Sequence, residues 1–93
     1  MRVISQDGTI DVPYEMVVIQ RFEEDVYFLN RNLTGVENLI NDITLAEYST
    51  KEKAIKAMEM LREAWINEAI EFTHGIYHRN IVFQFPQDDE IEV

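Results

Sequence analysis

The amino-terminal half of the chain alternates apolar and polar positions in short runs, a pattern that is typical of β-strands. Residues 3–5 and 9–12 are two such runs, and Asp7 and Gly8 lie between them. An Asp-Gly pair between alternating runs predicts a tight β-hairpin. Pro13 follows the second run. Because proline has no N–H for a ladder hydrogen bond, it predicts the end of that strand or an edge position.

Residues 17–22 and 26–30 form a second pair of runs, which are rich in β-branched and aromatic side chains. An acidic triplet at residues 23–25 separates them, so we expect a second hairpin with three carboxylates in its turn. Turn-forming residues, mainly asparagines, dominate residues 31–42 and predict a loop.

Two more strands are expected in the rest of the chain. Residues 43–48 alternate, with Ile43 and Leu45 on one face. Residues 81–85 alternate as well, and Pro86 ends them. The apolar face of this last strand is formed by Ile81, Phe83 and Phe85.

The longest periodic segment follows residue 48 and predicts an α-helix. Residues 49–52 fit a capping box, in which Ser49 is the N-cap and Glu52 bonds back to the cap amide. Gly75 predicts the end of the helix. Apolar residues recur in steps of four and three and form one stripe, which consists of Ala54, Met58, Leu61, Trp65, Ala69 and Phe72.

This order of elements, several strands, one long helix and a last strand, predicts an α+β domain. We expect one antiparallel sheet of about five to six short strands in the order ββββ(β)αβ, packed against the Trp65 stripe of the helix. Residues 1–86 are expected to form this single domain. Residues 87–93 are expected to form an acidic C-terminal tail, solvated unless a basic group holds it.

The composition narrows the classes of function. The 93 residues include 18 acidic and 8 basic side chains, with a formal net charge of −10 and no cysteine. Lack of cysteine excludes disulfides, thiol catalysis and cysteine-ligated metals, and favours a cytoplasmic protein. No apolar run is long enough for a signal peptide or a membrane span. The charge argues against direct binding of nucleic acid or anionic membranes, but permits a basic protein partner.

Residues that could carry catalysis are few. Glu71, His74 and His78 have a spacing that could hold a metal ion on a continued helix, so a small metal-dependent or hydrolytic enzyme is one hypothesis. Gly75 lies between the histidines, and histidines at a helix terminus are the simpler interpretation. No nucleophile motif or glycine-rich phosphate loop is present, and we therefore expect no enzyme, no cofactor and no metal site.

The acidic residues are the candidate partner-binding site. A row of carboxylates on a small protein can occupy the basic groove in which another protein binds nucleic acid, whereas the simpler interpretation is that acidity keeps the protein soluble. The candidates are Asp88, Asp89, Glu90 and Glu92 after the last strand, Glu23, Glu24 and Asp25 in the second hairpin, and Glu52, Glu59, Glu63 and Glu71 on the sides of the helix.

Three segments of the chain resemble a known group of proteins. These segments are residues 2–15 (RVISQDGTIDVPYE), residues 48–54 (YSTKEKA) with residues 58–61, and residues 83–93 (FQFPQDDEIEV). The chain resembles small uncharacterised proteins encoded by prophages and other mobile elements of Firmicutes. This resemblance implies a host cytoplasm as the location, but it transfers no activity and no catalytic residues.

In that context the acidity suggests an inhibitor. Small acidic proteins of mobile elements include anti-restriction and anti-CRISPR proteins, some of which mimic DNA. The acidity together with this context leads to the hypothesis of a protein that binds and inhibits a host nucleic-acid-binding defence protein. The alternative is an accessory or assembly protein of a mobile element that pairs with itself or with a larger partner. For that alternative, changes at Val17 or Ile19 are expected to matter more than changes in the acidic tail.

Overall fold

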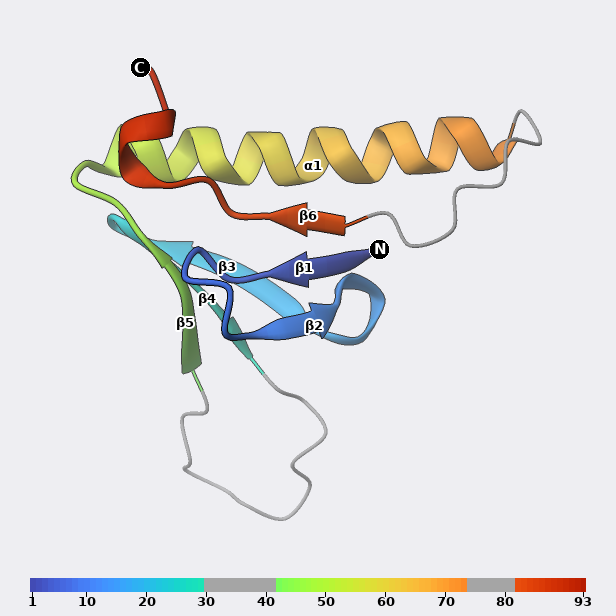
Figure 1. Cartoon of the computed structure of the whole chain (residues 1–93), viewed down its shortest axis with the longest axis horizontal. Coiled ribbons are helices and arrows are strands. Elements are labelled where there is room, and N and C mark those ends of the chain that lie inside the picture. Colours follow the sequence, from blue (N-terminus) through green and yellow to red (C-terminus); the bar gives the residue numbers. More distant parts are fainter. Residues whose placement is uncertain (30–41, 74–81) are drawn as a thin grey trace, which may run out of the picture.

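The structure is a computed structural model that describes residues 1–29, 42–73 and 82–93. These residues form an α+β fold, which confirms the predicted fold class (Figure 1). The strands are β1 (Arg2–Ile4), β2 (Asp11–Pro13), β3 (Val18–Phe22), β4 (Asp25–Leu29), β5 (Asp42–Glu47) and β6 (Val82–Gln84). The helices are α1 (Lys51–Thr73) and two short 3₁₀ helices, η1 (Tyr14–Met16) and η2 (Asp88–Glu90).

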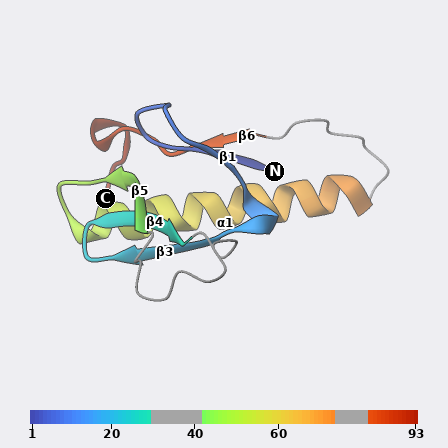
Figure 2. The ribbon, with the colours of Figure 1, turned by 90° about the horizontal axis from the view of Figure 1, so that it is seen from below.

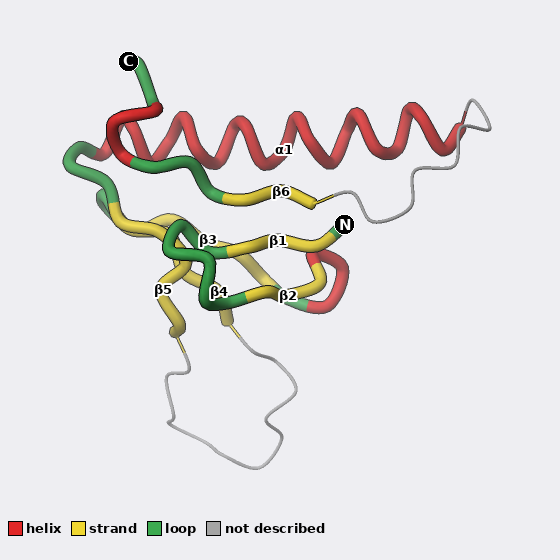
Figure 3. The backbone as a smooth tube through the Cα atoms, in the orientation of Figure 1, coloured by secondary structure: helices red, strands yellow, loops and turns green. Residues whose placement is uncertain are grey.

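The strands form two sheets of three strands, and the expected single antiparallel sheet of five to six strands is wrong. One sheet has the order β2-β1-β6 and is mixed, because β6 runs parallel to β1. The other has the order β3-β4-β5 and is antiparallel throughout. The chain leaves β2 at Pro13, which cannot continue a ladder, and passes through η1 before β3 begins (Figure 3). This turn separates the second hairpin from the first.

Both expected hairpins are present. In the first, β1 and β2 pair with Val3 opposite Val12, and Gly8 in the connecting loop has a φ of 79° that favours glycine. In the second, Phe22 faces Asp25, so the turn consists of Glu23 and Glu24 while Asp25 belongs to β4. Of the expected acidic triplet, two residues thus form the turn and the third is the first residue of β4.

The helix carries its buried residues on the predicted stripe. Ala54 and Leu61 are buried, Met58 is half-buried, and Trp65 packs its ring on that of Tyr14 with centroids 5.0 Å apart. Ala57 is buried as well, because it lies three residues after Ala54 and four before Leu61, next to the stripe on the helix surface. The side chains of Ala69 and Phe72 lie outside the residues that the structure describes. Outside the helix, the largest fully buried side chains of the core include Val3, Val26, Leu45 and Phe85.

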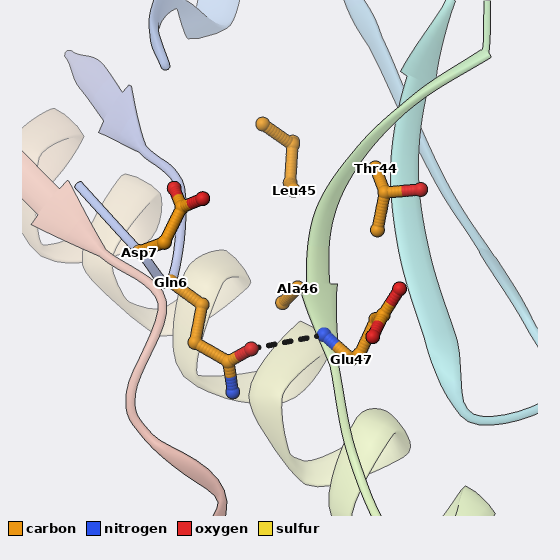
Figure 4. Close-up of a pocket in the computed structure, with 6 residues that line it drawn as sticks. All are labelled: Gln6, Asp7, Thr44, Leu45, Ala46 and Glu47. Carbon is orange, nitrogen blue, oxygen red and sulfur yellow. Dashed lines mark hydrogen bonds between the residues drawn. The ribbon is translucent and has the colours of Figure 1, made fainter. Parts of the chain in front are cut away.

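Gln6 joins the two sheets and the C-terminal segment. Its backbone N–H donates to the carbonyl of Leu45 (2.7 Å), and its side-chain Oε1 accepts from the N–H of Glu47 (3.0 Å) (Figure 4). Its Nε2 donates to the carbonyl of Pro86 (3.2 Å), and its own carbonyl accepts from Nε2 of Gln87 (2.6 Å). The register of β5 shifts at Leu45, and this bulge directs the carbonyl of Leu45 toward the other sheet.

Candidate functional site

Two of the predicted acidic segments meet at the start of α1. Tyr48 and Ser49 are neighbours in the chain, and their backbone N–H groups donate hydrogen bonds to two different segments. The N–H of Tyr48 donates to the carbonyl of Glu24 (3.0 Å), and the N–H of Ser49 donates to Oδ1 of Asp88 (2.6 Å). The β3–β4 turn and η2 therefore flank the same end of the helix, as Figures 1 and 2 show from two directions.

The C-terminal segment is fixed in place rather than fully solvated. Asp88 accepts from the Nζ of Lys53 at both its carbonyl (2.8 Å) and its Oδ2 (3.2 Å), so a basic group does hold the segment. Ile91 is 5% exposed and belongs to the core. The hydrogen bond from the Ser49 N–H, followed by that from Lys53, keeps the pKa of Asp88 below its usual value. Asp89, Glu90 and Glu92 remain exposed.

Within η2 the carboxylate of Glu90 has a structural role. Its Oε1 accepts from the N–H of Gln87 (2.7 Å), and the side chain of Gln87 accepts from the backbone N–H of Glu90, which completes a capping box. The exposed carboxylates of this segment are thus carried on a backbone that is held at both ends.

The third contribution comes from the β4–β5 ladder. Asp25 lies directly opposite Glu47, so the ladder places two carboxylates side by side. Glu52 adds another carboxylate in the first turn of α1. We call this surface the acidic end. It contains half of the 18 acidic residues of the chain, namely Glu23, Glu24, Asp25, Glu47, Glu52, Asp88, Asp89, Glu90 and Glu92.

Two predicted candidates lie apart from the acidic end. Glu59 and Glu63 are exposed on α1, but they are about 12 Å and about 18 Å beyond Lys51 along the helix axis. Glu59 approaches Lys56, with Oε2 and Nζ 3.8 Å apart. The sequence had not indicated Glu47, because its position opposite Asp25 depends on the register of β5. The only available signal was its place at the end of an expected strand.

The structure does not describe the residues of the alternative metal-site hypothesis. His74, His78 and the side chain of Glu71 lie outside the described residues. Among the described residues, no group of three or more metal-ligating side chains is placed to hold an ion. No helix in the described part of the chain is both long enough and apolar enough to cross a membrane.

A hollow of about 290 Å³ lies between the β1–β2 loop and β5, lined by Gln6, Asp7 and the stretch 44–47 (Figure 4). The carboxylate of Asp7 accepts hydrogen bonds at Oδ1 from the hydroxyls of Ser5 (2.6 Å) and Thr9 (2.7 Å) and from the Thr9 N–H (3.0 Å). The Ser5 hydroxyl, followed by the two Thr9 donors, lowers the pKa of Asp7 from 3.8 to about 2. Such a carboxylate stays ionised and holds the loop, and it is unsuited to act as a general acid.

Comparison of the chain with protein-family models, with curated proteins and with solved structures finds no match. The function is therefore inferred from the charge and geometry of the chain's own residues. Of the features described, the acidic end is the one in which the fold gathers chemically similar side chains from separate segments.

Proposed function

We propose that this protein binds a positively charged surface of a host nucleic-acid-binding defence protein through its acidic end, and thereby inhibits it. The host and the mobile element come from the resemblance to Firmicutes prophage proteins. The binding surface comes from the position of the carboxylates. An inhibitor of the anti-restriction or anti-CRISPR type that acts as a nucleic-acid mimic is the function that this combination supports best.

The observation that carries the proposal is the gathering of carboxylates from three separate segments at one end of α1. Asp88 and Glu90 accept hydrogen bonds that hold the fold, but the exposed carboxylates Asp89 and Glu92 accept none of these bonds, and their mutual repulsion opposes the clustering. Duplex DNA presents one negative charge per about 1.7 Å of its axis, and a protein that binds DNA is shaped to receive such a density. A compact cluster of carboxylates offers the same kind of charge to that surface.

The fixed backbone of the C-terminal segment also supports binding. Asp89 and Glu92 are exposed, while their neighbours Asp88 and Ile91 are tied to α1 and to the core. A free tail would lose conformational entropy when a partner orders it, and a segment that is already ordered avoids much of this loss. The carboxylates are thus presented in nearly their bound arrangement.

The proposal is tested by measuring binding to a panel of purified DNA- and RNA-guided nucleases and restriction enzymes at several salt concentrations. Attraction between the acidic end and a basic groove should speed association and should weaken as salt rises. The double variant Asp89→Lys with Glu92→Lys should weaken binding by about tenfold or more. The control, Glu59→Lys with Glu63→Lys, changes the net charge equally but lies away from the acidic end.

The proposal fails if no member of the panel forms a salt-sensitive complex and the Asp89 and Glu92 variant leaves the fitness of the phage or element unchanged. If both double variants weaken binding equally, net charge alone is responsible and the acidic end is not the binding surface.

A further inference from the structure

In the described part of the chain the two sheets have four edge strands, and three of them carry features that prevent pairing with another chain. The strand β2 has three residues and ends in Pro13, and β6 also has only three residues. The edge of β5 is interrupted by the bulge at Leu45, and Gln6 already bonds to the backbone of Leu45 and Glu47. These three edges are therefore unsuited to accept a further strand.

The fourth edge strand, β3, has none of these features. Its five residues pair with β4 without a register shift, and it contains no proline, no lysine and no acidic residue. Its one charged side chain, Arg21, donates from Nη1 to the carbonyl of Glu23 in the adjoining turn (2.9 Å). Alternate residues of an antiparallel strand direct their N–H and C=O groups to opposite sides, so about half of these groups face away from β4. Among the described residues no strand pairs with this side, and Figure 2 shows β3 as the outermost strand beside α1.

Apolar surface accompanies this free edge. Phe22 is 65% exposed, although it lies within the strand. A groove of about 400 Å³ runs between β3 and α1 and is lined by Tyr14, Val17, Ile19 and Met58. Arg62 is the charged residue of its lining, in a protein with more than twice as many acidic as basic residues. The occupant of this edge should therefore supply a backbone edge, apolar contacts and a carboxylate near Arg62.

We infer that the occupant is a second copy of this chain, whose β3 pairs antiparallel with β3 about a two-fold axis at Gln20. This register is the one in which all five residues of both strands are paired. Val18 of one copy then lies opposite Phe22 of the other and covers its exposed ring. The two sheets merge into one six-stranded sheet, and the interface is isologous, as in most homodimers.

Charge complementarity favours this arrangement over a foreign strand. In the same register Glu23 of one copy lies opposite Val17 of the other, about 4.8 Å away across the ladder. Val17 and Arg62 line the same groove, so the acidic β3–β4 turn of each copy meets the arginine of the other. Two chains of charge −10 repel at long range, but physiological salt screens this repulsion beyond about 8 Å, and the local contacts decide the pairing.

The test is the mass of the full chain in solution, measured by light scattering and sedimentation over a wide concentration range at physiological salt. We expect a concentration-dependent dimer. Phe22→Lys should abolish it, because it places a charge in the strand interface, while the far-UV circular dichroism of the monomer stays unchanged since Phe22 is exposed. Arg62→Glu should weaken the dimer about tenfold, because two-fold symmetry repeats the lost contact.

A charge exchange separates this interface from others. Adding Glu23→Arg to Arg62→Glu should restore the dimer, whereas Glu63→Gln, next to Arg62 but directed elsewhere on the helix, should leave it as in the unaltered protein. If the protein has the mass of a single chain at every concentration, the inference is wrong. This holds also if β3 pairs with a strand of a different protein. A dimer that survives Phe22→Lys and Arg62→Glu overturns it as well.

Discussion

The side chain of Asp88 accepts a hydrogen bond from the backbone N–H of Ser49, with Oδ1 and N only 2.6 Å apart. The two residues are 39 positions apart in the chain, and the contact joins the C-terminal segment to the start of α1. An anionic oxygen at a helix N-terminus also interacts favourably with the helix dipole. Asp88 therefore organises the acidic end as well as contributing charge to it.

Removal of the Asp88 carboxylate should release the C-terminal segment. In Asp88→Ala, the Ser49 N–H loses its acceptor and the Lys53 ammonium loses one of its two, so the segment is held to α1 by the bond from Lys53 to the backbone carbonyl of residue 88 and by the burial of Ile91. We expect faster hydrogen exchange in residues 88–93, faster digestion by carboxypeptidase and a lower melting temperature. The control Asp89→Ala changes an exposed neighbour, and if it has the same effect as Asp88→Ala, the proposed role of Asp88 is wrong.

Acid should destabilise the fold in a defined pH range. The pKa of Asp7 in the folded protein is about 2, below the 3.8 expected in the unfolded chain, because Ser5 and Thr9 donate hydrogen bonds to its carboxylate. The resulting stability is complete above pH 3.8 and is lost as the pH falls toward about 2, since the unfolded chain then binds the proton first.

Urea unfolding across this range measures the effect. In Asp7→Asn the free energy of unfolding should vary less steeply with pH between about 4 and about 2. Asp89→Asn removes a surface carboxylate without touching Ser5 or Thr9, and should leave the slope nearly unchanged. Equal slopes in the unaltered protein and in Asp7→Asn would contradict this origin of the acid sensitivity.

The helix cap distinguishes two adjacent residues. The hydroxyl of Thr50, not that of Ser49, accepts the N–H of Lys53 (3.2 Å), so Thr50 is the N-cap and the expected cap at Ser49 with its Glu52 capping box is wrong. Thr50→Ala should lower the free energy of unfolding by about 1 kcal/mol. Ser49→Ala should have little effect, because Ser49 contributes its backbone N–H. Chemical denaturation of both variants tests this. A larger loss of stability in Ser49→Ala than in Thr50→Ala would show that Ser49 is the N-cap.

Gln6 should be the most sensitive polar residue of the fold. Gln6→Ala removes the side-chain bonds to the N–H of Glu47 and to the carbonyl of Pro86, and leaves that N–H without its acceptor. We expect a loss of about 1–3 kcal/mol in the free energy of unfolding, because each of the two lost hydrogen bonds contributes about 0.5–1.5 kcal/mol. Gln20→Ala, an exposed glutamine in β3, is the control for denaturation at low protein concentration. A loss no larger than that of the control would contradict the role of Gln6.

Local sequence was sufficient for most of the elements. The Asp-Gly pair, the acidic turn after Phe22 and the apolar stripe from Ala54 to Trp65 each reflect interactions between residues close in the chain, and both hairpins and the helix follow from them. The division into two sheets did not follow, because alternation identifies a strand without identifying its neighbours. It was Pro13 and η1 that moved β3 away from the first hairpin.

For the candidate site, the sequence by itself determined how much negative charge the protein carries and in which segments it lies. Only the tertiary structure decided that the β3–β4 turn, the end of β5 and the C-terminal segment share one end of α1, while Glu59 and Glu63 lie elsewhere. The reason is that charge is a property of each residue, whereas its concentration on a surface depends on contacts between distant positions. The hydrogen bonds from Tyr48 to Glu24 and from Ser49 to Asp88 are such contacts, and no local pattern encodes them.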